Sequence, residues 1–523
     1  MASHVGRGDQ RSVRDALTVG EGSRPLARRI DPKPQRLRQC RAPAQPGNQD
    51  GDTMKHPEND NSVLTIESNS IEYVAPEARH GKPADLFTLW FCTNVAPLAV
   101  ISGATSVLVF HLDLVSAILA IAAGQCFGAI FHALTSAQGP LVGVPQMIQS
   151  RAQFGRYGSL LVVGFTILIY LGFFVSNIIL AGKTLHTAAP AVSVPLATVL
   201  GAVLATLVGV IGCDFIHRFN KVGAWFMGSA LLVGIALIAP QLNARIFQQG
   251  HFELANWFAM FGLCAVWQIS FAPYTSDYSR YLPTSAGFAK TFAYTYFGTS
   301  LGTIFAFLFG VLAVSTGHST DAMQAVRTQT GMFGYVLIFL FLVNIIGHNG
   351  MNLYGGVLSI ITAAQTFRPH WAPGRGIRVV VSTILLVAST ATALWASSNF
   401  IAIFLTAIFA MRIVLAPWIA INLIDFYLIN DRHYRVVEII SSNGGVYGSF
   451  NFRTIAIYVF GIAIQVPFME ESFFHGPWAS IAGGADVSWM VGLVATALTY
   501  RLFASKVGLC SALRSPAAAP ASE

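Results

Sequence analysis

A series of apolar segments, each about as long as a membrane is thick, limits what this sequence can fold into more than any other feature. From Leu86 onward, apolar runs alternate with short polar connections, and a helix needs about 20 apolar residues to cross the hydrocarbon core of a bilayer. The predicted spans are 86–110, 114–137, 158–182, 191–212, 222–242, 255–275, 288–316, 331–363, 376–397, 399–424, 452–469 and 485–504. The ninth and tenth are the hardest to separate, because only Ser397, Ser398 and Asn399 provide a turn. The sequence therefore predicts an all-α polytopic membrane protein with about 12 transmembrane helices.

Composition and charge agree with this prediction and orient the chain. Of the 523 residues, 54% are apolar and 11% are charged, which is too apolar for a soluble domain of this size. With the N-terminus inside, the even-numbered connections and the C-terminal tail hold 15 Lys and Arg, whereas the odd-numbered connections hold 3. This positive-inside bias predicts a multi-pass protein of the cytoplasmic (inner) cell membrane with both termini cytoplasmic. The sequence assigns no role to Arg412 inside span ten or to Asp425 at its end.

The two ends of the chain differ from the apolar centre. Residues 1–84 are predicted to form a disordered cytoplasmic tail, and 1–53 are interpreted as a mis-called extension before Met54. The transporter-like region is 85–505, and 506–523 form a second disordered cytoplasmic tail. Because 13 of the 32 Lys and Arg precede residue 83, the net charge of +8 belongs to tail and loops, and we expect no nucleic-acid partner. Six scattered cysteines predict neither a disulfide frame nor a metal site.

Two spans contain signals for a helix break. The first span carries Pro97 and then Gly103, and the sixth carries Pro273. Each Ala-Pro pair lies in the first helix of a five-helix half, 85–242 or 255–424. Discontinuous helices at corresponding positions of two halves are typical of transporters built from inverted repeats. The alternative is that these prolines only kink the helices, since proline is common in membrane helices.

Aromatic and amide side chains lie together in spans three and six. Phe173 and Asn177 are four residues apart, so they share one helix face. A ring beside an amide suits a flat heterocycle, because the ring can stack while the amide pairs with ring nitrogens and carbonyls. Hydrogen bonding between helices is the alternative. Trp267 and Gln268 stand just before the break in span six and are candidates for the same site.

Span eight and the inner end of span six carry the other polar candidates. Asn349 and Asn352 lie in an apolar helix and need partners, which are either a substrate or a neighbouring helix. His348 is either a structural residue or a proton relay. Asp277 and Arg280 are three residues apart, so they form either an intrahelical ion pair or a gate.

Three stretches resemble the first nucleobase–cation symporter family, in its purine–cytosine permease branch. They are GPLVGVPQMIQSRAQFG at 139–155, WQISFAPYTSDYSRYLP at 267–283 and NGMNLYGG at 349–356, and the resemblance runs through most of 85–505. It implies a 5+5 inverted-repeat (LeuT-like) core with discontinuous helices 1 and 6, plus two C-terminal helices at 452–504. It also implies inward transport of a nucleobase or related heterocycle, driven by sodium or protons. The first stretch is punctuated by Gly and Pro, which predicts a cytoplasmic loop that re-enters the membrane or lies at its interface.

The resemblance also assigns roles to residues. It places the substrate ring between Trp267 and Phe173, with Asn177, Asn349 and Asn352 at its polar edge. The full set of predicted substrate-binding residues is Phe173, Asn177, Trp267, Gln268, Asn349, Asn352, Asn94 and Ser102. The family usually has Trp where this chain has Phe173. Where its sodium-coupled members carry Ser and Thr before the span-eight Asn, this chain has Gly347 and Ile346, which favours proton coupling.

These features predict a secondary active transporter rather than an enzyme. No Walker pattern, G-x-G-x-x-G or H-E-x-x-H motif is present, so we expect no cofactor and no ATP, only a proton or sodium gradient. The expected partners are a small heterocyclic substrate and the lipid bilayer, and the oligomeric state is left open. A permease for a non-nucleobase heterocycle such as allantoin, hydantoin or a vitamin precursor, with sodium as driving ion, is the first alternative. A membrane-embedded enzyme or a sensor is a remote one.

Overall fold

The computed structural model describes residues 73–504 except 212, 245, 249, 318, 369, 370, 372, 373, 472 and 473. The expectations for Met54, for the tail before residue 73 and for 506–523 therefore lie outside the described residues. The described residues belong to one compact unit, 61–523, and fold mainly as helices.

The first five spans contain one sharply bent helix and four uninterrupted ones. Their helices are α1 (Pro83–Asn94), α2 (Pro97–Leu108), α3 (Leu114–Ser136), α6 (Leu160–Ala188), α7 (Val194–Ile211) and α8 (Cys213–Ile238). The bend between α1 and α2 is 58°. Pro97 is the first residue of α2, where its missing N–H costs the helix nothing. Val95 and Ala96 form the break itself.

The second five spans repeat this order. They are α9 (Leu254–Ile269) with the 3-10 helix η4 (Ala272–Tyr274) and α10 (Thr275–Ser279), then α11 (Phe288–Gly317), α13 (Phe333–Phe367), α14 (Arg375–Ala396) and α15 (Phe400–Leu423). A 3-10 turn, η6 (Ser397–Asn399), separates α14 from α15 at the position the sequence indicated. Span six changes from α-helix to 3-10 helix and back without a bend above 40°, so its interruption is milder than that of span one.

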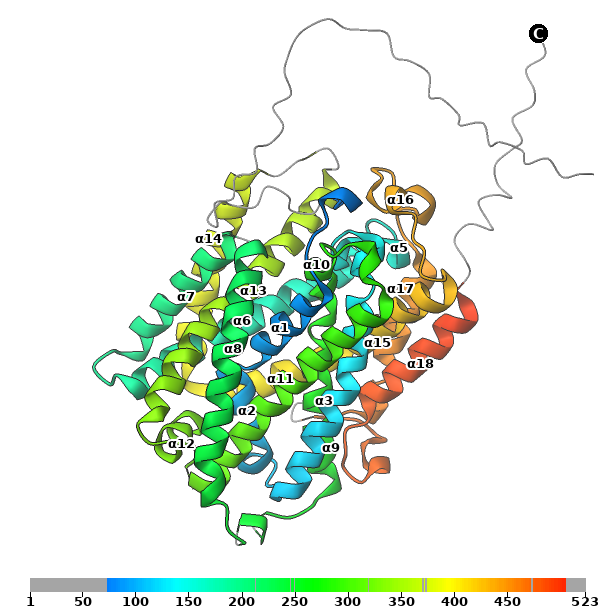
Figure 1. Cartoon of the computed structure of the whole chain (residues 1–523). Coiled ribbons are helices and arrows are strands. Elements are labelled where there is room, and N and C mark those ends of the chain that lie inside the picture. Colours follow the sequence, from blue (N-terminus) through cyan, green and yellow to red (C-terminus); the bar gives the residue numbers. More distant parts are fainter. Residues whose placement is uncertain are drawn as a thin grey trace, which may run out of the picture. The chain divides into compact units, whose positions relative to one another are not determined.

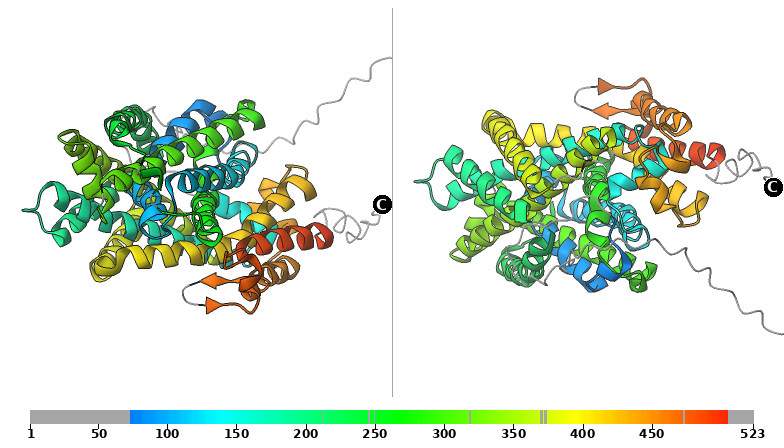
Figure 2. Two further views of the ribbon diagram at one scale, coloured as in Figure 1. Left: turned by 90° about the horizontal axis from the view of Figure 1, so that it is seen from below. Right: turned by 90° about the horizontal axis from the view of Figure 1, so that it is seen from above.

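Two shorter helices, α17 (Phe452–Ala463) and α18 (Ser488–Phe503), complete the twelve spans. The predicted fold class, an all-α polytopic protein with about 12 spans, is confirmed. The remaining elements are short: η1 (Pro76–Ala78), α4 (Gly139–Val142), α5 (Gln146–Phe154), η2 (Ala239–Gln241), η3 (Ile246–Gln248), η5 (Thr284–Ala286), α12 (Ala322–Gln329), the π-helix η7 (Ile424–Ile429), α16 (Val436–Ile440), η8 (Gly445–Tyr447), η9 (Val466–Phe468), β1 (Glu470–Glu471), β2 (Phe474–His475) and η10 (Ala479–Ala482). The two strands form an antiparallel hairpin before α18 (Figure 2).

The helix packing repeats itself when the two halves are exchanged. α3, the second span, packs on α9, and α11, the seventh, packs on α1 and α2. α6, the third span, packs on α13, the eighth, and α3, the second, packs on α11, the seventh. Each of these pairs joins equivalent spans of the two halves. The short helices α5 and α12 are also equivalent, because each follows the second span of its own half. Figure 1 shows them at opposite ends of the bundle. This is the pattern of an inverted repeat.

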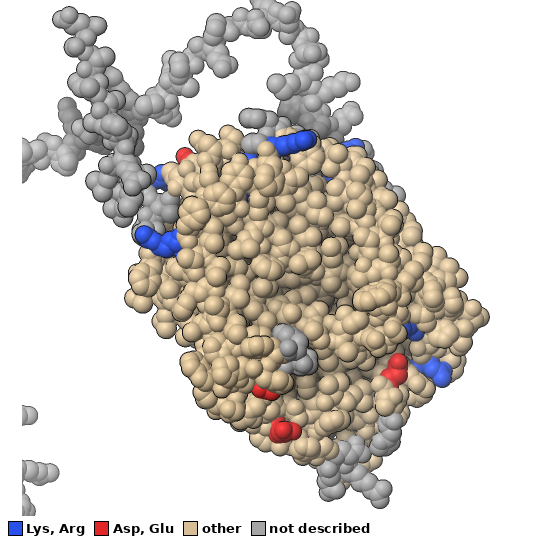
Figure 3. All heavy atoms as spheres, turned by 180° about the vertical axis from the view of Figure 1, so that it is seen from behind, with Lys and Arg blue, Asp and Glu red and all other residues tan. Residues whose placement is uncertain are grey.

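The surface of the bundle suits a membrane. Large apolar side chains such as Leu168, Trp225, Phe339 and Leu498 are exposed on its helices. In Figure 3, Lys, Arg, Asp and Glu lie toward the two ends of the visible face, and a broad band of other side chains occupies its middle. Spanning helices satisfy their own backbone hydrogen bonds, so apolar side chains can face lipid around them.

Gly103 has a different role from the helix break predicted for it. α2 continues through Gly103 to Leu108, and only the Val95–Ala96 segment interrupts span one. A Cβ at Gly103 would collide with the carbonyl oxygen of Phe307 on α11. The prediction was wrong because a glycine in a membrane helix also permits close helix packing, which is its function here.

For the cytoplasmic loop 139–155, the structure contradicts only one of the two predicted alternatives, a position at the membrane interface. Its centre is α5, and every residue of this helix is buried. α5 packs against α10, α13, α15, α16 and α17, so it lies beneath other elements and not at an interface with lipid or water.

Candidate functional site

Two aromatic rings meet edge to face in the middle of the bundle. Trp267 lies two residues before the end of α9, and Phe173 lies in the middle of α6. Their ring centroids are 6.0 Å apart and their planes cross at 79°. Phe307 of α11 borders the same indole at 5.4 Å. Both Trp267 and Phe173 are buried, so this part of the bundle is closed to solvent.

Three amides from α6 and α13 meet at one oxygen atom. Asn177 Nδ2 donates to Asn349 Oδ1 at 3.3 Å, and Asn352 Nδ2 donates to the same oxygen at 3.1 Å. Asn349 Nδ2 in turn donates to the Phe174 carbonyl at 3.0 Å. Among the described residues, no hydrogen bond reaches Oδ1 of Asn177 or Asn352. These two oxygens can accept hydrogen bonds from a ligand, and the shared partners hold them in place.

Asn94 fixes the indole of Trp267. Trp267 Nε1 donates to Asn94 Oδ1 at 2.9 Å. The Asn94 amide nitrogen donates to the Trp90 carbonyl at 2.7 Å and to Thr299 Oγ1 at 3.1 Å. Asn94 is the last residue of α1, so the break in span one places its side chain beside span six. Sequence reasoning selected Asn94 as a site residue but missed Thr299, one of several hydroxyls in an ordinary apolar helix.

Gln268 belongs to a polar network that Thr299 connects to Asn94. Its Nε2 donates to Gln125 Oε1 at 2.8 Å and to Thr303 Oγ1 at 2.7 Å, while its Oε1 accepts from Thr299 Oγ1 at 2.5 Å. His132 Nδ1 lies 3.4 Å from the same oxygen. The amide is thus occupied by protein partners, and we assign Gln268 to this network in place of the predicted substrate contact.

His348 lies against the broken end of α1. Its Nδ1 lies 2.9 Å from the Thr93 carbonyl oxygen, and because a carbonyl only accepts, Nδ1 carries the proton. One turn earlier on α13, Asn344 Nδ2 donates to the Cys92 carbonyl at 2.9 Å. Carbonyl groups freed at the end of an interrupted helix are the type of ligand that a coupling cation uses in transporters. Here, two nitrogen donors from α13 bind them.

Ser102, Asp277 and Arg280 lie outside the ring and amide cluster. Ser102 Oγ donates to the Leu98 carbonyl at 2.8 Å, within its own helix. Asp277 Oδ1 accepts from the backbone N–H of Gln146, the first residue of α5, at 2.8 Å. Arg280 Nε donates to the Asp277 carbonyl at 3.3 Å, and its Nη2 donates to the Tyr281 hydroxyl at 2.9 Å. The carboxylate of Asp277 therefore connects α10 to α5, a contact that spacing along one helix does not predict.

Two arginines at the end of α5 and just beyond it connect this helix to the C-terminus of α13. Arg151 Nη2 donates to Thr366 Oγ1 at 3.1 Å, and Arg156 Nη2 donates to the Thr366 carbonyl at 2.8 Å. Burial, and secondarily the charge of Arg156, lowers the pKa of Arg151 to about 10, so it stays protonated at neutral pH. Cations are favourable at a helix C-terminus. Together with Asp277, these residues fix α5 between the two halves.

The structure gives structural roles to the two ionisable residues of span ten. Arg412 Nη2 pairs with Asp486 Oδ2 at 2.8 Å, and both residues are buried. This ion pair connects α15 to the segment before α18. Asp425 accepts hydrogen bonds from Tyr434 Oη at 2.5 Å and Tyr500 Oη at 2.8 Å.

Comparison with known families decides what this bundle is. Residues 73–492 match the family described as "Permease for cytosine/purines, uracil, thiamine, allantoin". The chain belongs to this permease family. Permeases of this family are multi-pass membrane transporters and not enzymes, so the predicted class is confirmed.

Individual relatives agree with the family. The chain is 35% identical over 442 residues to the putative purine-cytosine permease YxlA of Bacillus subtilis, a match that covers 84% of this chain and 95% of that protein. It is 24% identical over 475 residues to the purine-cytosine permease fcyB of Emericella nidulans, covering 84% and 88%. Among solved structures, Mhp1, a nucleobase-cation-symport-1 family transporter with bromovinylhydantoin bound, matches with a TM-score of 0.68 at 16% identity, covering 84% of this chain and 95% of Mhp1. That likeness confirms the inverted-repeat fold.

Proposed function

We propose that this permease imports a nucleobase or a similar small heterocycle by proton symport. The observation that carries the proposal is the combination of the Trp267–Phe173 ring pair with the amide cluster around Asn349. For a planar ring to bind between these two side chains, which meet edge to face here, the two rings must move apart, and one edge of the ligand is then directed at the amides. The two free amide oxygens, on Asn177 and Asn352, select a ligand edge with N–H donors.

Alternating access around this closed site moves the substrate. The site residues come from α1, α6, α9 and α13, so both halves of the repeat contribute to it. Rocking of one half against the other then exposes the site to one side at a time. The contacts of Asp277 and Arg151 with α5 and α13 hold one end closed in this structure. By the positive-inside count, this is the cytoplasmic end of the bundle. Both chain termini then lie on the cytoplasmic side of the cytoplasmic membrane.

We assign the coupling role to His348. An imidazole can take up and release one proton per transport cycle. Its Nδ1 already donates to the Thr93 carbonyl, so a second proton binds at Nε2. Two nitrogen donors, from His348 and Asn344, take up carbonyls that a sodium ion would need. Both observations support protons over sodium as the driving ion.

Uptake by purified protein in proteoliposomes tests the proposal. Radiolabelled cytosine, hypoxanthine, uracil, allantoin and hydantoin are offered with an inward proton gradient, and sodium is then replaced by choline. We expect accumulation of at least one nucleobase that collapses with a protonophore and is unchanged by choline. Accumulation that requires sodium refutes the coupling assignment, and transport of none of these heterocycles refutes the substrate assignment.

A further inference from the structure

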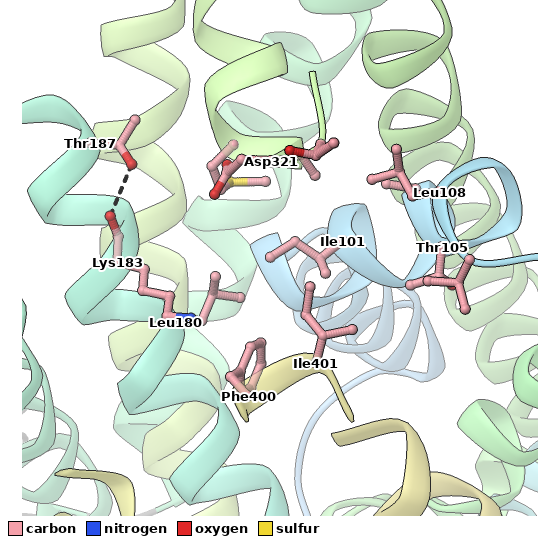
Figure 4. A pocket seen from close by; sticks show the side chains of 14 residues that line it. Ile101, Thr105, Leu108, Leu180, Lys183, Thr187, Asp321, Phe400 and Ile401 are labelled. Atoms are coloured by element: carbon pink, nitrogen blue, oxygen red, sulfur yellow. Dashed lines mark hydrogen bonds between the residues drawn. The ribbon is translucent and has the colours of Figure 1, made fainter. Parts of the chain in front are cut away.

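A cavity lies outside the ring and amide cluster, at the end of the bundle that carries α12. Its volume is about 250 Å³, and α2, α6, α12 with the two residues before it, and the first turn of α15 enclose it. Figure 4 shows the side chains that line it, among them Lys183, Asp321 and Phe400. The cavity is below the range of about 300–1,000 Å³ usual for drug-sized ligands, so it suits a small one.

The walls of this cavity combine one cation, one anion and one aromatic ring. The Lys183 ammonium lies 5.5 Å from the centroid of the Phe400 ring, and among the described residues it has no hydrogen-bond partner. Asp321 caps α12 by accepting from Gln324 N at 2.8 Å with Oδ1. In the described part of the chain, its Oδ2 receives no hydrogen bond. The cavity therefore presents a free donor, a free acceptor and an apolar surface to the same small volume.

The cavity follows the ring and amide cluster along two helices. Leu180 of α6 lines it, and Leu180 is one turn beyond Asn177 on the same helix. Lys183 is six residues beyond Asn177, about 9 Å along the helix axis. Ile101 and Thr105 of α2 line the opposite wall, after the break at which Asn94 ends α1. A ligand here would lie directly beyond the central site on the side opposite α5.

We propose that this cavity is an outer vestibule that binds the substrate before it enters the central site, and that its ligand is a neutral lactam ring. A lactam or ureide edge offers a carbonyl acceptor beside an N–H donor. Lys183, which lies beside Phe400, donates to a ring carbonyl, and Asp321, on another side of the cavity in Figure 4, accepts with Oδ2 from a ring N–H that faces it. Phe400 and Leu180 cover the ring plane. This inference rests on the proposed function and narrows its substrate class to heterocycles with such an edge, including uracil, hypoxanthine and hydantoin.

Initial-rate uptake from outside tests the vestibule. The probe is radiolabelled uracil, hypoxanthine or hydantoin, whichever the wild type transports fastest in cells without their own permeases. The variants are Lys183→Met, Asp321→Asn and Phe400→Leu. The matched control is Arg327→Gln, because Arg327 is a cation at the same end of the bundle that donates to the Tyr335 hydroxyl and does not line the cavity.

A binding role for the vestibule makes a specific kinetic prediction. Lys183→Met and Asp321→Asn should each raise the apparent KM roughly three- to tenfold, the loss expected for a half-exposed hydrogen bond to a charged group, with Vmax within about twofold of wild type. Asp321→Asn retains the helix cap, so it keeps the test valid even where Lys183→Met fails to fold. Arg327→Gln should leave both constants unchanged.

Two other results would tell a failure of the vestibule proposal apart from a failure of the proposed function. An unchanged KM in Lys183→Met and Asp321→Asn, with uptake still lost in Trp267→Ala, overturns the vestibule and leaves the proposed function standing. Uptake of none of the three probes by the wild type, together with no uptake of cytosine or allantoin, overturns both.

Discussion

The indole nitrogen of Trp267 donates a hydrogen bond to the side-chain oxygen of Asn94 at 2.9 Å, which connects interrupted span six to the last residue before the break in span one. The two residues are 173 positions apart in the sequence. Each half alone would leave one of these groups without its partner. This contact fixes the plane of the ring on which we propose that the substrate stacks. It also makes the site dependent on both halves at once.

Loss of the Asn94 side chain should weaken substrate binding without removing the stacking ring. Asn94→Ala leaves the buried indole N–H without a partner, which costs about 1–3 kcal/mol. We expect the apparent KM to rise about tenfold or more, with normal amounts of protein in the membrane. Ser229→Ala, which removes a hydroxyl bonded only within α8, is the control and should behave as wild type. Equal KM values in both variants would disprove the positioning role.

The amide cluster should be more sensitive than any single ring contact. Asn352→Ala removes one free acceptor and one donor to Asn349 Oδ1, so we expect the KM to rise about thirtyfold, equivalent to ~2 kcal/mol. Asn177→Ala should act similarly. Because both amides share Asn349, the double variant should lose less than the sum of the single losses. Uptake assays combined with substrate binding to detergent-solubilised protein measure this, and strictly additive losses would argue against a shared site.

His348→Gln separates binding from coupling. Glutamine retains an N–H donor for the Thr93 carbonyl but has no titratable proton. We expect this variant to exchange labelled for unlabelled substrate across the membrane at near wild-type rates and to lose accumulation driven by a pH gradient. His433→Gln, at an exposed histidine outside the bundle core, is the matched control. Retained proton-driven accumulation in His348→Gln would remove His348 from the coupling mechanism.

Asp277 should stabilise the closed inner end. Its carboxylate accepts from the first N–H of α5, where a negative charge is favourable by about 0.3–1 kcal/mol or more in partly buried geometry. Asp277→Asn retains an acceptor but removes the charge, so we expect easier inner opening. Labelling of a cysteine introduced at Tyr274, which is buried in this structure, should become faster from the inner side. Labelling at the wild-type rate would show that the contact does not hold the inner end closed.

Gly103 should be intolerant of any side chain. A Cβ there collides with the backbone of Phe307, and relief requires α2 and α11 to separate. Gly103→Ala should therefore destabilise the folded protein by about 1–3 kcal/mol and lower its melting temperature in detergent. Gly164→Ala provides the control, because a Cβ at this position of α6 meets nothing within 4 Å. Similar melting temperatures for the two variants would contradict the packing role.

Local patterns predicted much of this protein. Apolar run length gave the number and approximate position of the spans, since a helix that satisfies its own hydrogen bonds in lipid needs a fixed length. The turn at Ser397–Asn399 is present as a 3-10 helix, and Pro97 begins α2. The ring and amide four residues apart on α6 do share a face, as helix geometry requires.

Local sequence patterns did not predict contacts between residues that are far apart in the sequence. Trp267 and Gln268 are neighbours in sequence, but α9 directs one toward Phe173 and the other toward Gln125 of α3. Burial of α5 and its capping by Asp277 depend on helices that sequence separation does not reveal. The sequence by itself determined that the chain crosses the membrane about twelve times and that span one is interrupted just before Pro97, because these follow from length and backbone chemistry. Only the tertiary structure decided which polar groups meet, because the hydrogen bonds from Trp267 to Asn94 and from Asn177 to Asn349 join helices whose relative rotation no local pattern specifies.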